Sequence, residues 1–234
     1  MTQSAPAPAP QDFVESILQL RPRVAVFDCD GTLWSGDAGA EFFYWEIEHG
    51  LISPEVAAWA LPRYRDYKAG KVDEETMCGE MVTIHRGINV ENIRHAAAEF
   101  FHEHVAKRIF PELQELTRRL AEKGCHLWAV SSTNEWVITE GVRRFGIPAE
   151  HVIAACVQMD GDRASARLLR VPTGQGKAKA IREVIGRPIS VAFGNSVHDA
   201  AMLEVARHAF AINPNPDLEI MAAERDWTIY KPIA

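Results

Sequence analysis

The feature that most constrains the fold is a short, nearly continuous apolar run, Arg23 to Phe27, that stops abruptly at Asp28. Such a run is typical of a central parallel strand buried on both faces. Similar runs follow at residues 125–130, 152–157, 189–193, 209–212 and 228–230. Helical patterns separate several of them, at residues 111–123, 135–145, 177–185 and 200–206. This alternation predicts an α/β fold with a doubly wound, Rossmann-like parallel sheet.

One long segment, residues 36–104, breaks the alternation. It is rich in aromatic and charged residues and carries four helical patterns, at residues 40–49, 54–67, 73–84 and 90–105. We therefore expect residues 12–35 and 105–234 to form the α/β core and residues 36–104 to form an inserted α-helical cap domain. Alternating Ala and Pro predict a disordered tail at residues 1–11, and Asp160-Gly161-Asp162 predicts a hairpin turn within residues 158–171.

Composition excludes several classes of function. The net charge of −7 argues against a nucleic-acid partner, because binding a phosphate backbone needs clustered Lys and Arg. A local basic group can still bind a single phosphate. The four cysteines form no CxxC pair, so neither a zinc site nor a disulfide framework is indicated. No apolar run approaches the roughly 20 residues of a membrane helix, and the N-terminus lacks a signal pattern, so we expect a cytoplasmic protein. Nothing in the sequence indicates the oligomeric state.

The sharpest motif is DCDGTL, residues 28–33, at the end of the first predicted strand. Ligands gather beyond the carboxyl ends of the strands in an open α/β sheet. Asp28 and Asp30 stand two positions apart there, so strand alternation places both on one side. Two neighbouring carboxylates repel each other unless protons or a cation neutralise them, and Mg²⁺ prefers oxygen ligands. An Asp that merely caps a turn is the simpler alternative, but this motif is too specific for it.

The motif resembles the first motif of the haloacid dehalogenase superfamily, and similar motifs follow in the family's order to about residue 227. By this resemblance Asp28 is the nucleophile that forms an aspartyl phosphate, and Asp30 is the general acid/base. The resemblance also implies a Mg²⁺ cofactor held by Asp28 and the Asp30 backbone, with Gly31 and Thr32 next to the phosphate. The second Asp favours phosphoryl chemistry, because the true dehalogenases of the superfamily lack it.

Two later motifs resemble the phosphate-binding parts of that family. Ser131, with Ser132 beside it, follows a predicted strand, where a hydroxyl can donate to a phosphate oxygen. Lys177 begins a predicted helix and would neutralise the phosphate and the nucleophile. Lys179 is the competing candidate.

The fourth motif departs from the family's pattern. In GNSVHD, residues 194–199, Asn195 occupies the place where the family usually has a metal-binding Asp. An amide oxygen can bind Mg²⁺ but removes one negative charge, so we expect weaker metal binding. Asp199 is expected in the metal's outer sphere, through water or by orienting Lys177. His198 is expected to be a neutral surface residue.

The helical insert and the tail motif resemble the phosphoserine phosphatase branch. That resemblance makes Asp37 a candidate reader of a substrate amino group. The arginine that reads phosphoserine's carboxylate has no clear counterpart, because Met81 aligns at its position. A basic residue from elsewhere in the segment could take its place, and the candidates are Arg63, Arg65, Lys68 and Arg86. The aromatic residues of the segment form either a cage for a quaternary ammonium or the core of the cap, and they are Phe42, Phe43, Tyr44, Trp45, Trp59, Tyr64 and Tyr67.

These expectations converge on a Mg²⁺-dependent phosphomonoesterase that acts on a small phosphorylated metabolite. Two alternatives remain open at this point. A phosphotransferase or phosphomutase of the same superfamily would pass the phosphoryl group from Asp28 to a second substrate. A phosphate-binding regulatory module with weakened catalysis would explain Asn195, although Asp28, Asp30, Ser131 and Lys177 count against it.

Overall fold

The computed structural model describes residues 9–232 and contains one seven-stranded sheet in the order β4-β3-β2-β1-β5-β6-β7. The strands are β1 Val24–Phe27, β2 His126–Asn134, β3 Val152–Asp160, β4 Arg163–Arg170, β5 Ile189–Gly194, β6 Ala206–Ile212 and β7 Thr228–Tyr230. Neighbouring strands are parallel except for β3 and β4, which are antiparallel. The predicted doubly wound fold is confirmed, and the strand bearing the first motif lies at the centre of the sheet.

The helices match the predicted alternation closely. Four of them lie between β1 and β2, namely α2 Ala38–Glu48, α3 Pro54–Lys68, α4 Glu74–Thr83 and α5 Val90–Phe100. The others are α1 Pro10–Gln19, α6 Pro111–Glu122, α7 Glu135–Val142, α8 Gln175–Val184, α9 Ala200–Glu204 and α10 Pro216–Glu224. A short π-helix, Phe101–Val105, continues α5. Helix α1 starts at Pro10, two residues before the predicted start of the core at residue 12, because Pro suits the first turn of a helix. The rest of the predicted tail, residues 1–8, lies outside the described residues.

Side chains of β1 alternate between two hydrophobic cores, one on each face of the sheet. Ala25 and Phe27 pack into the larger core, beneath α1, α6 and α7. Val24 and Val26 pack into the other, beneath α8, α9 and α10. A strand with helices on both faces has no solvated side, which explains why the run is apolar throughout. Its first polar residue falls where the strand leaves the sheet, at Asp28.

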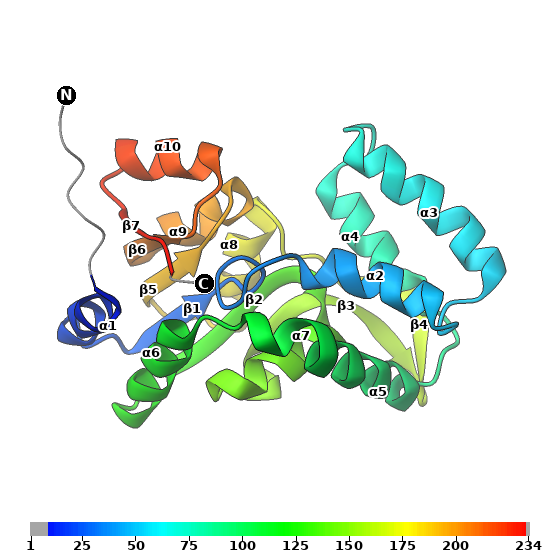
Figure 1. Ribbon diagram of the computed structural model, residues 1–234, viewed down its shortest axis with the longest axis horizontal. Helices are drawn as coiled ribbons and strands as arrows, with labels where there is room; N and C mark the ends of the chain where they lie inside the picture. The colour runs from blue at the N-terminus through cyan, green and yellow to red at the C-terminus, as the bar shows by residue number, and fades with distance from the viewer. Residues whose placement is uncertain (1–8, 233–234) are drawn as a thin grey trace.

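Helices α2, α3 and α4 share a third, smaller core and lie together on the side of the molecule away from α1 and α10 (Figure 1). The faces of α2 differ in their partners: Phe43 belongs to this small core, whereas Phe42 and Trp45 belong to the large core of the sheet. The inserted helices are therefore packed onto the α/β core through α2, α4 and α5, whereas α3 packs mainly against α4.

The predicted hairpin forms from β3 and β4, with Gly161 in the turn at φ +62°. It pairs with the turn between α4 and α5, because Gly87 N–H donates to the Ala164 carbonyl oxygen at 2.7 Å and Val90 N–H donates to the Asp162 carbonyl oxygen at 2.8 Å. The hairpin thus ties the inserted helices to the edge of the sheet.

Between residues 9 and 232, every helix is too short or too polar to cross a lipid bilayer.

Candidate active site

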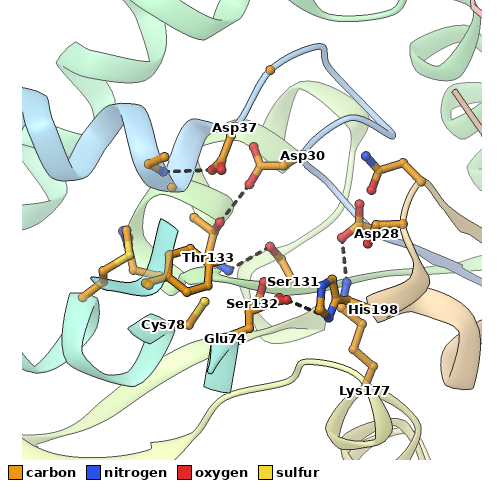
Figure 2. Close-up of a pocket in the computed structure, with 18 of the residues that line it drawn as sticks. Asp28, Asp30, Asp37, Glu74, Cys78, Ser131, Ser132, Thr133, Lys177 and His198 are labelled. Carbon is orange, nitrogen blue, oxygen red and sulfur yellow. Dashed lines mark hydrogen bonds and ion pairs between the residues drawn. The ribbon is translucent and has the colours of Figure 1, made fainter. Parts of the chain in front are cut away.

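The carboxyl edge of the central strands holds the Asp28 side chain. The Asp28 backbone N–H donates to the Phe193 carbonyl oxygen at 2.9 Å and so extends the pairing of β1 with β5. Its Oδ1 accepts a hydrogen bond from Lys177 Nζ at 2.7 Å, and its Oδ2 accepts one from Thr32 Oγ1 at 2.8 Å. These two donors fix the carboxylate at one side of a cavity of about 240 Å³ (Figure 2).

Asp30 lines the same cavity but is held by different elements. Its Oδ1 accepts hydrogen bonds from Trp34 Nε1 and Ala38 N–H, both at 2.7 Å. Its Oδ2 accepts one from Thr133 Oγ1 at 2.8 Å, so strand β2 and the start of α2 both orient it. The two carboxylates therefore face one cavity, as the motif spacing predicted, without sharing a hydrogen-bond donor.

Both carboxylates are perturbed by their surroundings. Burial raises the pKa of Asp28 to about 7, and Asp199 adds to the rise while Lys177 opposes it. Burial raises the pKa of Asp30 to about 6, with a contribution from Asp37, and the three hydrogen bonds just described oppose the rise. A carboxyl group with a pKa near neutrality can both give and take a proton, which suits acid/base chemistry.

Lys177 enters the cavity from the first turn of α8 and is buried, with 2% of the residue exposed. Its Nζ donates to Asp28 Oδ1 at 2.7 Å, to Asp199 Oδ1 at 2.5 Å and to the Val130 carbonyl oxygen at 3.1 Å. Burial lowers the pKa of this ammonium, but the two carboxylates outweigh burial and raise it above its ordinary value. The competing Lys179 is exposed on the same helix, so the structure favours Lys177.

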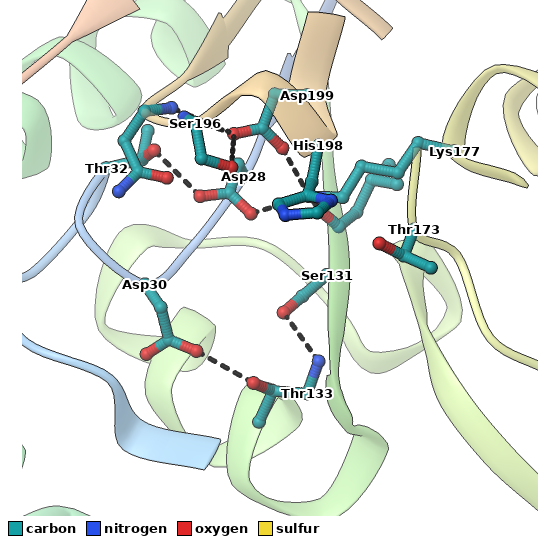
Figure 3. A network of polar contacts seen from close by, with 12 residues as sticks. Asp28, Asp30, Thr32, Ser131, Thr133, Thr173, Lys177, Ser196, His198 and Asp199 are labelled. Carbon is teal, nitrogen blue, oxygen red and sulfur yellow. Dashed lines mark hydrogen bonds and ion pairs between the residues drawn. The ribbon is translucent and has the colours of Figure 1, made fainter. Parts of the chain in front are cut away.

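Asp199 is buried and does not line the cavity. While Oδ1 binds Lys177, Oδ2 accepts hydrogen bonds from the N–H groups of Asn195 at 2.9 Å and Ser196 at 3.0 Å (Figure 3). Both carboxylate oxygens are engaged by protein donors. Asp199 thus orients Lys177, which is one of the two roles expected for it, and closes the turn after β5. Its place in the metal's outer sphere stays a prediction.

Asn195 lines the cavity beside the first motif. A Cβ placed on Gly31 would stand only 2.0 Å from Asn195 Nδ2, and Gly31 has φ +75°, so a side chain there would clash and be strained. Glycine is thus required for the two loops to approach. Gly31 and Thr32 do not line the cavity, and the Thr32 side chain is fully buried and donates to Asp28. Their place next to the phosphate stays a prediction.

The end of β2 supplies hydroxyl groups to the opposite wall. Ser131, Ser132 and Thr133 all line the cavity, and Ser131 Oγ accepts a hydrogen bond from Thr133 N–H at 3.1 Å. Sequence reasoning missed Thr133, the residue that orients Asp30. Its position directly after the two serines was the available signal.

Helices α2, α3 and α4 form the remaining wall. Asp37 caps α2, accepting a hydrogen bond from Ala40 N–H at 2.8 Å, and lines the cavity. Of the aromatic cluster, Tyr64 and Tyr67 line it too. Phe42, Phe43 and Trp45 are instead buried in the hydrophobic cores, and Tyr44 and Trp59 are exposed. The cluster is therefore mostly packing, with two rings at the site.

A contact between α4 and the core was not foreseen. Glu74 accepts a hydrogen bond from Thr173 Oγ1 at 2.7 Å and pairs with His198 Nδ1 at 2.7 Å. His198 is exposed at the surface, as expected, but the hydrogen bond to Glu74 raises its pKa and so favours the charged form over the expected neutral one. No sequence signal links these residues, because the contact joins segments far apart in the chain.

The oxygen groups beside Asp28 suit Mg²⁺. Each Asp28 oxygen accepts one hydrogen bond and keeps lone-pair capacity, and Asn195 adds an amide oxygen. Within residues 9–232, no group of three or more His, Cys, Asp or Glu side chains is arranged to hold a metal. Mg²⁺ commonly binds through one or two protein groups and keeps waters or substrate oxygens, so this sparse set fits it better than Zn²⁺.

Fold and site together define an α/β enzyme class whose site is built around an aspartate at the tip of the first strand. The sequence profile of the haloacid dehalogenase-like hydrolases matches residues 25–204, and the chain belongs to that family. The predicted resemblance is thereby confirmed.

Several known proteins are similar along most of the chain. Histidinol-phosphatase of Neisseria meningitidis serogroup C is 26% identical over 221 residues, covering 88% of this chain and 97% of that protein. A phosphoserine phosphatase of Mycobacterium tuberculosis is 26% identical over 215 residues, covering 88% of this chain and 69% of that protein. The family match and these phosphatase names bear out the prediction of a phosphatase enzyme.

Solved structures share the fold. A protein of unknown function from Bordetella pertussis Tohama I has a TM-score of 0.78 at 22% identity, covering 89% of this chain and 97% of that one. A substrate-bound phosphoserine phosphatase has a TM-score of 0.59 at 17% identity, covering 90% and 93%.

Proposed function

We propose that this enzyme is a Mg²⁺-dependent phosphomonoesterase that hydrolyses a small phosphorylated metabolite through an aspartyl phosphate on Asp28. The observation that carries the proposal is the convergence of Asp28, Asp30, Ser131 and Lys177 on one cavity of about 240 Å³. A cavity of this size suits a small metabolite. The phosphatase names of the relatives from Neisseria meningitidis and Mycobacterium tuberculosis support the reaction class.

In the first half-reaction, an Asp28 oxygen attacks phosphorus as the bond from phosphorus to the ester oxygen breaks. Asp30 donates its proton to the leaving oxygen, so the alcohol departs neutral. The Asp30 pKa of about 6 supports this role, because part of the population is protonated near neutral pH. Lys177 Nζ and the Ser131 hydroxyl stabilise negative charge on the phosphoryl oxygens.

In the second half-reaction, water attacks phosphorus and gives a proton to the Asp30 carboxylate. The bond from phosphorus to the Asp28 oxygen breaks, which restores the aspartate and releases inorganic phosphate. We propose that the Asp28 carboxylate, the Asp30 backbone carbonyl and the Asn195 amide oxygen would hold Mg²⁺. A bound Mg²⁺ ion would supply charge neutralisation at the phosphoryl group.

We propose residues 36–104 as a cap domain over a core of residues 12–35 and 105–234. The separate small core of α2, α3 and α4 supports this division. The placement of Tyr64, Tyr67 and Glu74 in the cavity wall supports a role for the cap in contacting the substrate. A cytoplasmic location is part of the same proposal, and the four free cysteines are consistent with it.

The test is hydrolysis of p-nitrophenyl phosphate with Mg²⁺ and with a chelator, for wild type and for Asp28→Asn. We expect turnover that requires Mg²⁺ and falls about a thousandfold or more in the variant, because the nucleophile is lost. Asp217→Asn on the exposed surface of α10 is the control and should match wild type. Acid-quenched wild type should carry one phosphoryl group on the peptide that contains Asp28.

Three results would contradict the proposal. An Asp28→Asn variant as active as wild type would remove the nucleophile assignment. Turnover that is undiminished in the presence of a chelator would contradict the requirement for Mg²⁺. Formation of a phosphorylated acceptor in place of free phosphate, when alcohols are supplied, would make the enzyme a phosphotransferase.

A further inference from the structure

The cavity has two chemically different walls. Core strands and loops supply the wall around Asp28, and α2, α3 and α4 supply the wall that faces the rest of the substrate (Figure 2). The residues that line the cavity from these three helices and the turn before α2 include two carboxylates, two tyrosines, Met81 and no Lys or Arg. The carboxylates are Asp37 and Glu74, and the tyrosines are Tyr64 and Tyr67.

Among the described residues that line the cavity, the basic groups are Lys177 and His198, and both come from the core. Lys177 is committed to Asp28 and to Asp199, at 2.7 and 2.5 Å. His198 is paired with Glu74 at 2.7 Å. A carboxylate on the substrate's alcohol would therefore meet acidic groups and find no bidentate partner, which costs binding energy.

A positive charge on the substrate's alcohol would instead be attracted by the groups of this wall. Asp37 is exposed toward solvent and keeps one oxygen, Oδ2, outside its capping hydrogen bond to Ala40. Burial raises the pKa of the Tyr64 and Tyr67 hydroxyls, and the Asp37 charge contributes, so its field reaches both rings. An ammonium group beside this carboxylate would gain a charge-assisted hydrogen bond.

The two rings add a second attraction for a cation. Tyr64 and Tyr67 lie three residues apart on α3, on one face of the helix, with ring centroids 5.7 Å apart. Phe43 and Tyr44 pack against Tyr64 at 5.1 and 5.4 Å, which holds its ring in place. Aromatic faces attract ammonium groups, most strongly where water is partly excluded.

We infer that the substrate's alcohol carries a positive charge and no carboxylate, as in the phosphate ester of an amino alcohol. The inference rests on the proposed phosphatase function and adds the substrate class to it. The acidic and aromatic wall selects the amine, and the absence of Lys and Arg among its cavity-lining residues rejects a carboxylate.

The test compares kcat/KM for four esters and p-nitrophenyl phosphate under one set of conditions. O-Phosphoethanolamine and the larger L-histidinol phosphate carry an amine and no carboxylate, and the latter also carries an imidazole. Glycerol 3-phosphate carries no charge on its alcohol, and O-phospho-L-serine carries an amine and a carboxylate. We expect at least one amine ester to exceed both glycerol 3-phosphate and phosphoserine by about tenfold or more, because hydrogen bonds to charged groups are strong.

Two variants probe the wall directly. Asp37→Asn keeps the helix cap, since Asn caps as well as Asp, and should lower the ratio of amine ester to glycerol 3-phosphate by about tenfold. Met81→Arg supplies a guanidinium and should raise phosphoserine relative to the amine ester, whereas Met81→Leu should not. Glu75→Gln, next to Glu74 but exposed outside the cavity, should leave every rate unchanged.

The outcomes separate the two proposals. Preference for glycerol 3-phosphate or phosphoserine by an enzyme that hydrolyses p-nitrophenyl phosphate would overturn the substrate class alone. An Asp37→Asn ratio equal to that of wild type would overturn the acidic wall as its cause. Failure to hydrolyse any of the five esters would overturn the phosphatase proposal and the inference with it.

Discussion

Lys177 and Lys179 stand two positions apart on α8, yet their surroundings differ completely. The Lys177 ammonium is buried between two carboxylates, whereas Lys179 is exposed. Burying a charge is tolerated only where partners compensate, so the position of Lys177 indicates a functional group held at some cost in stability. The pair offers a matched comparison on one helix.

We expect Lys177→Met to lower kcat for p-nitrophenyl phosphate by about a hundredfold or more, because a donor to the developing charge is lost. Stability should fall too, since Asp28 and Asp199 then lose their shared partner. Lys179→Met should match wild type in both properties. Steady-state kinetics and thermal unfolding measure the two effects, and inactivation by the Lys179 change instead would reverse the assignment.

Site residues that belong to sequence motifs could be predicted from the sequence, whereas site residues brought together only by the folded chain could not. Asp28, Asp30, Ser131 and Lys177 could be chosen because each falls at the end of a strand or the start of a helix in a recognisable pattern. The contact of Glu74 with His198 carries no such pattern, since it depends on how α4 meets the core. Such a pairing is set by packing and not by local residue order.

Helix α2 and the turn after α4 are joined by a buried pair that belongs to neither the motifs nor the cavity. His85 Nε2 lies 2.7 Å from Glu46 Oε2, and both residues are almost fully buried. His85 Nδ1 lies 3.1 Å from the Val82 carbonyl oxygen, which can only accept, so Nδ1 carries a proton. If Glu46 is ionised, Nε2 must also donate, and His85 is then an imidazolium.

This pair predicts a pH dependence of stability. Burial lowers the pKa of His85, but Glu46 outweighs burial and raises it above the ordinary value of about 6.5. Burial likewise raises the pKa of Glu46. The folded state therefore binds the proton more tightly than the unfolded state does, so the contribution of His85 is complete below about pH 6.5 and is lost as pH rises through the folded pKa.

We expect Glu46→Gln to destabilise the protein by about 3 kcal/mol at pH 6, with the difference from wild type narrowing toward pH 9. Urea unfolding across this range measures it. Glu48→Gln, exposed on the same helix, is the control. A difference that stays constant with pH would mean that the pair does not hold the extra proton.

The elements themselves were largely predictable, because helical and strand periods differ and the apolar runs are short. Strand β6 starts at Ala206, three residues before the predicted Ala209, since the polar residues of that stretch still pair with β5. The π-helix after α5 was predicted as ordinary helix. Backbone pairing and helix winding at element ends follow neighbouring elements, which periodicity alone does not describe.

At the scale of the whole molecule, the two ends of the described chain meet. Phe13 of α1 stacks on Tyr230 of β7 with ring centroids 3.7 Å apart, and it contacts Phe210 edge-on at 6.1 Å. Only 2% of Phe13 is exposed. Helix α1 thus covers one edge of the core and closes the sheet at the C-terminal strands.

We expect Phe13→Ala to lower the free energy of unfolding by about 3–5 kcal/mol, because a large buried ring leaves a cavity. Phe13→Leu should cost less, and Leu20→Ala, at a position that is 40% exposed, should cost little. Urea unfolding gives these values. Equal losses for Phe13→Ala and Leu20→Ala would show that α1 does not brace the fold.

The turn after β5 limits which substitutions this protein can accept during evolution. One Asp199 oxygen secures the backbone of that turn and the other orients the lysine, so a single side chain carries two requirements. A substitution of Asp199 would therefore impair both the stability of the fold and the rate of turnover. Asp199 thus constrains both folding and turnover although it does not line the cavity.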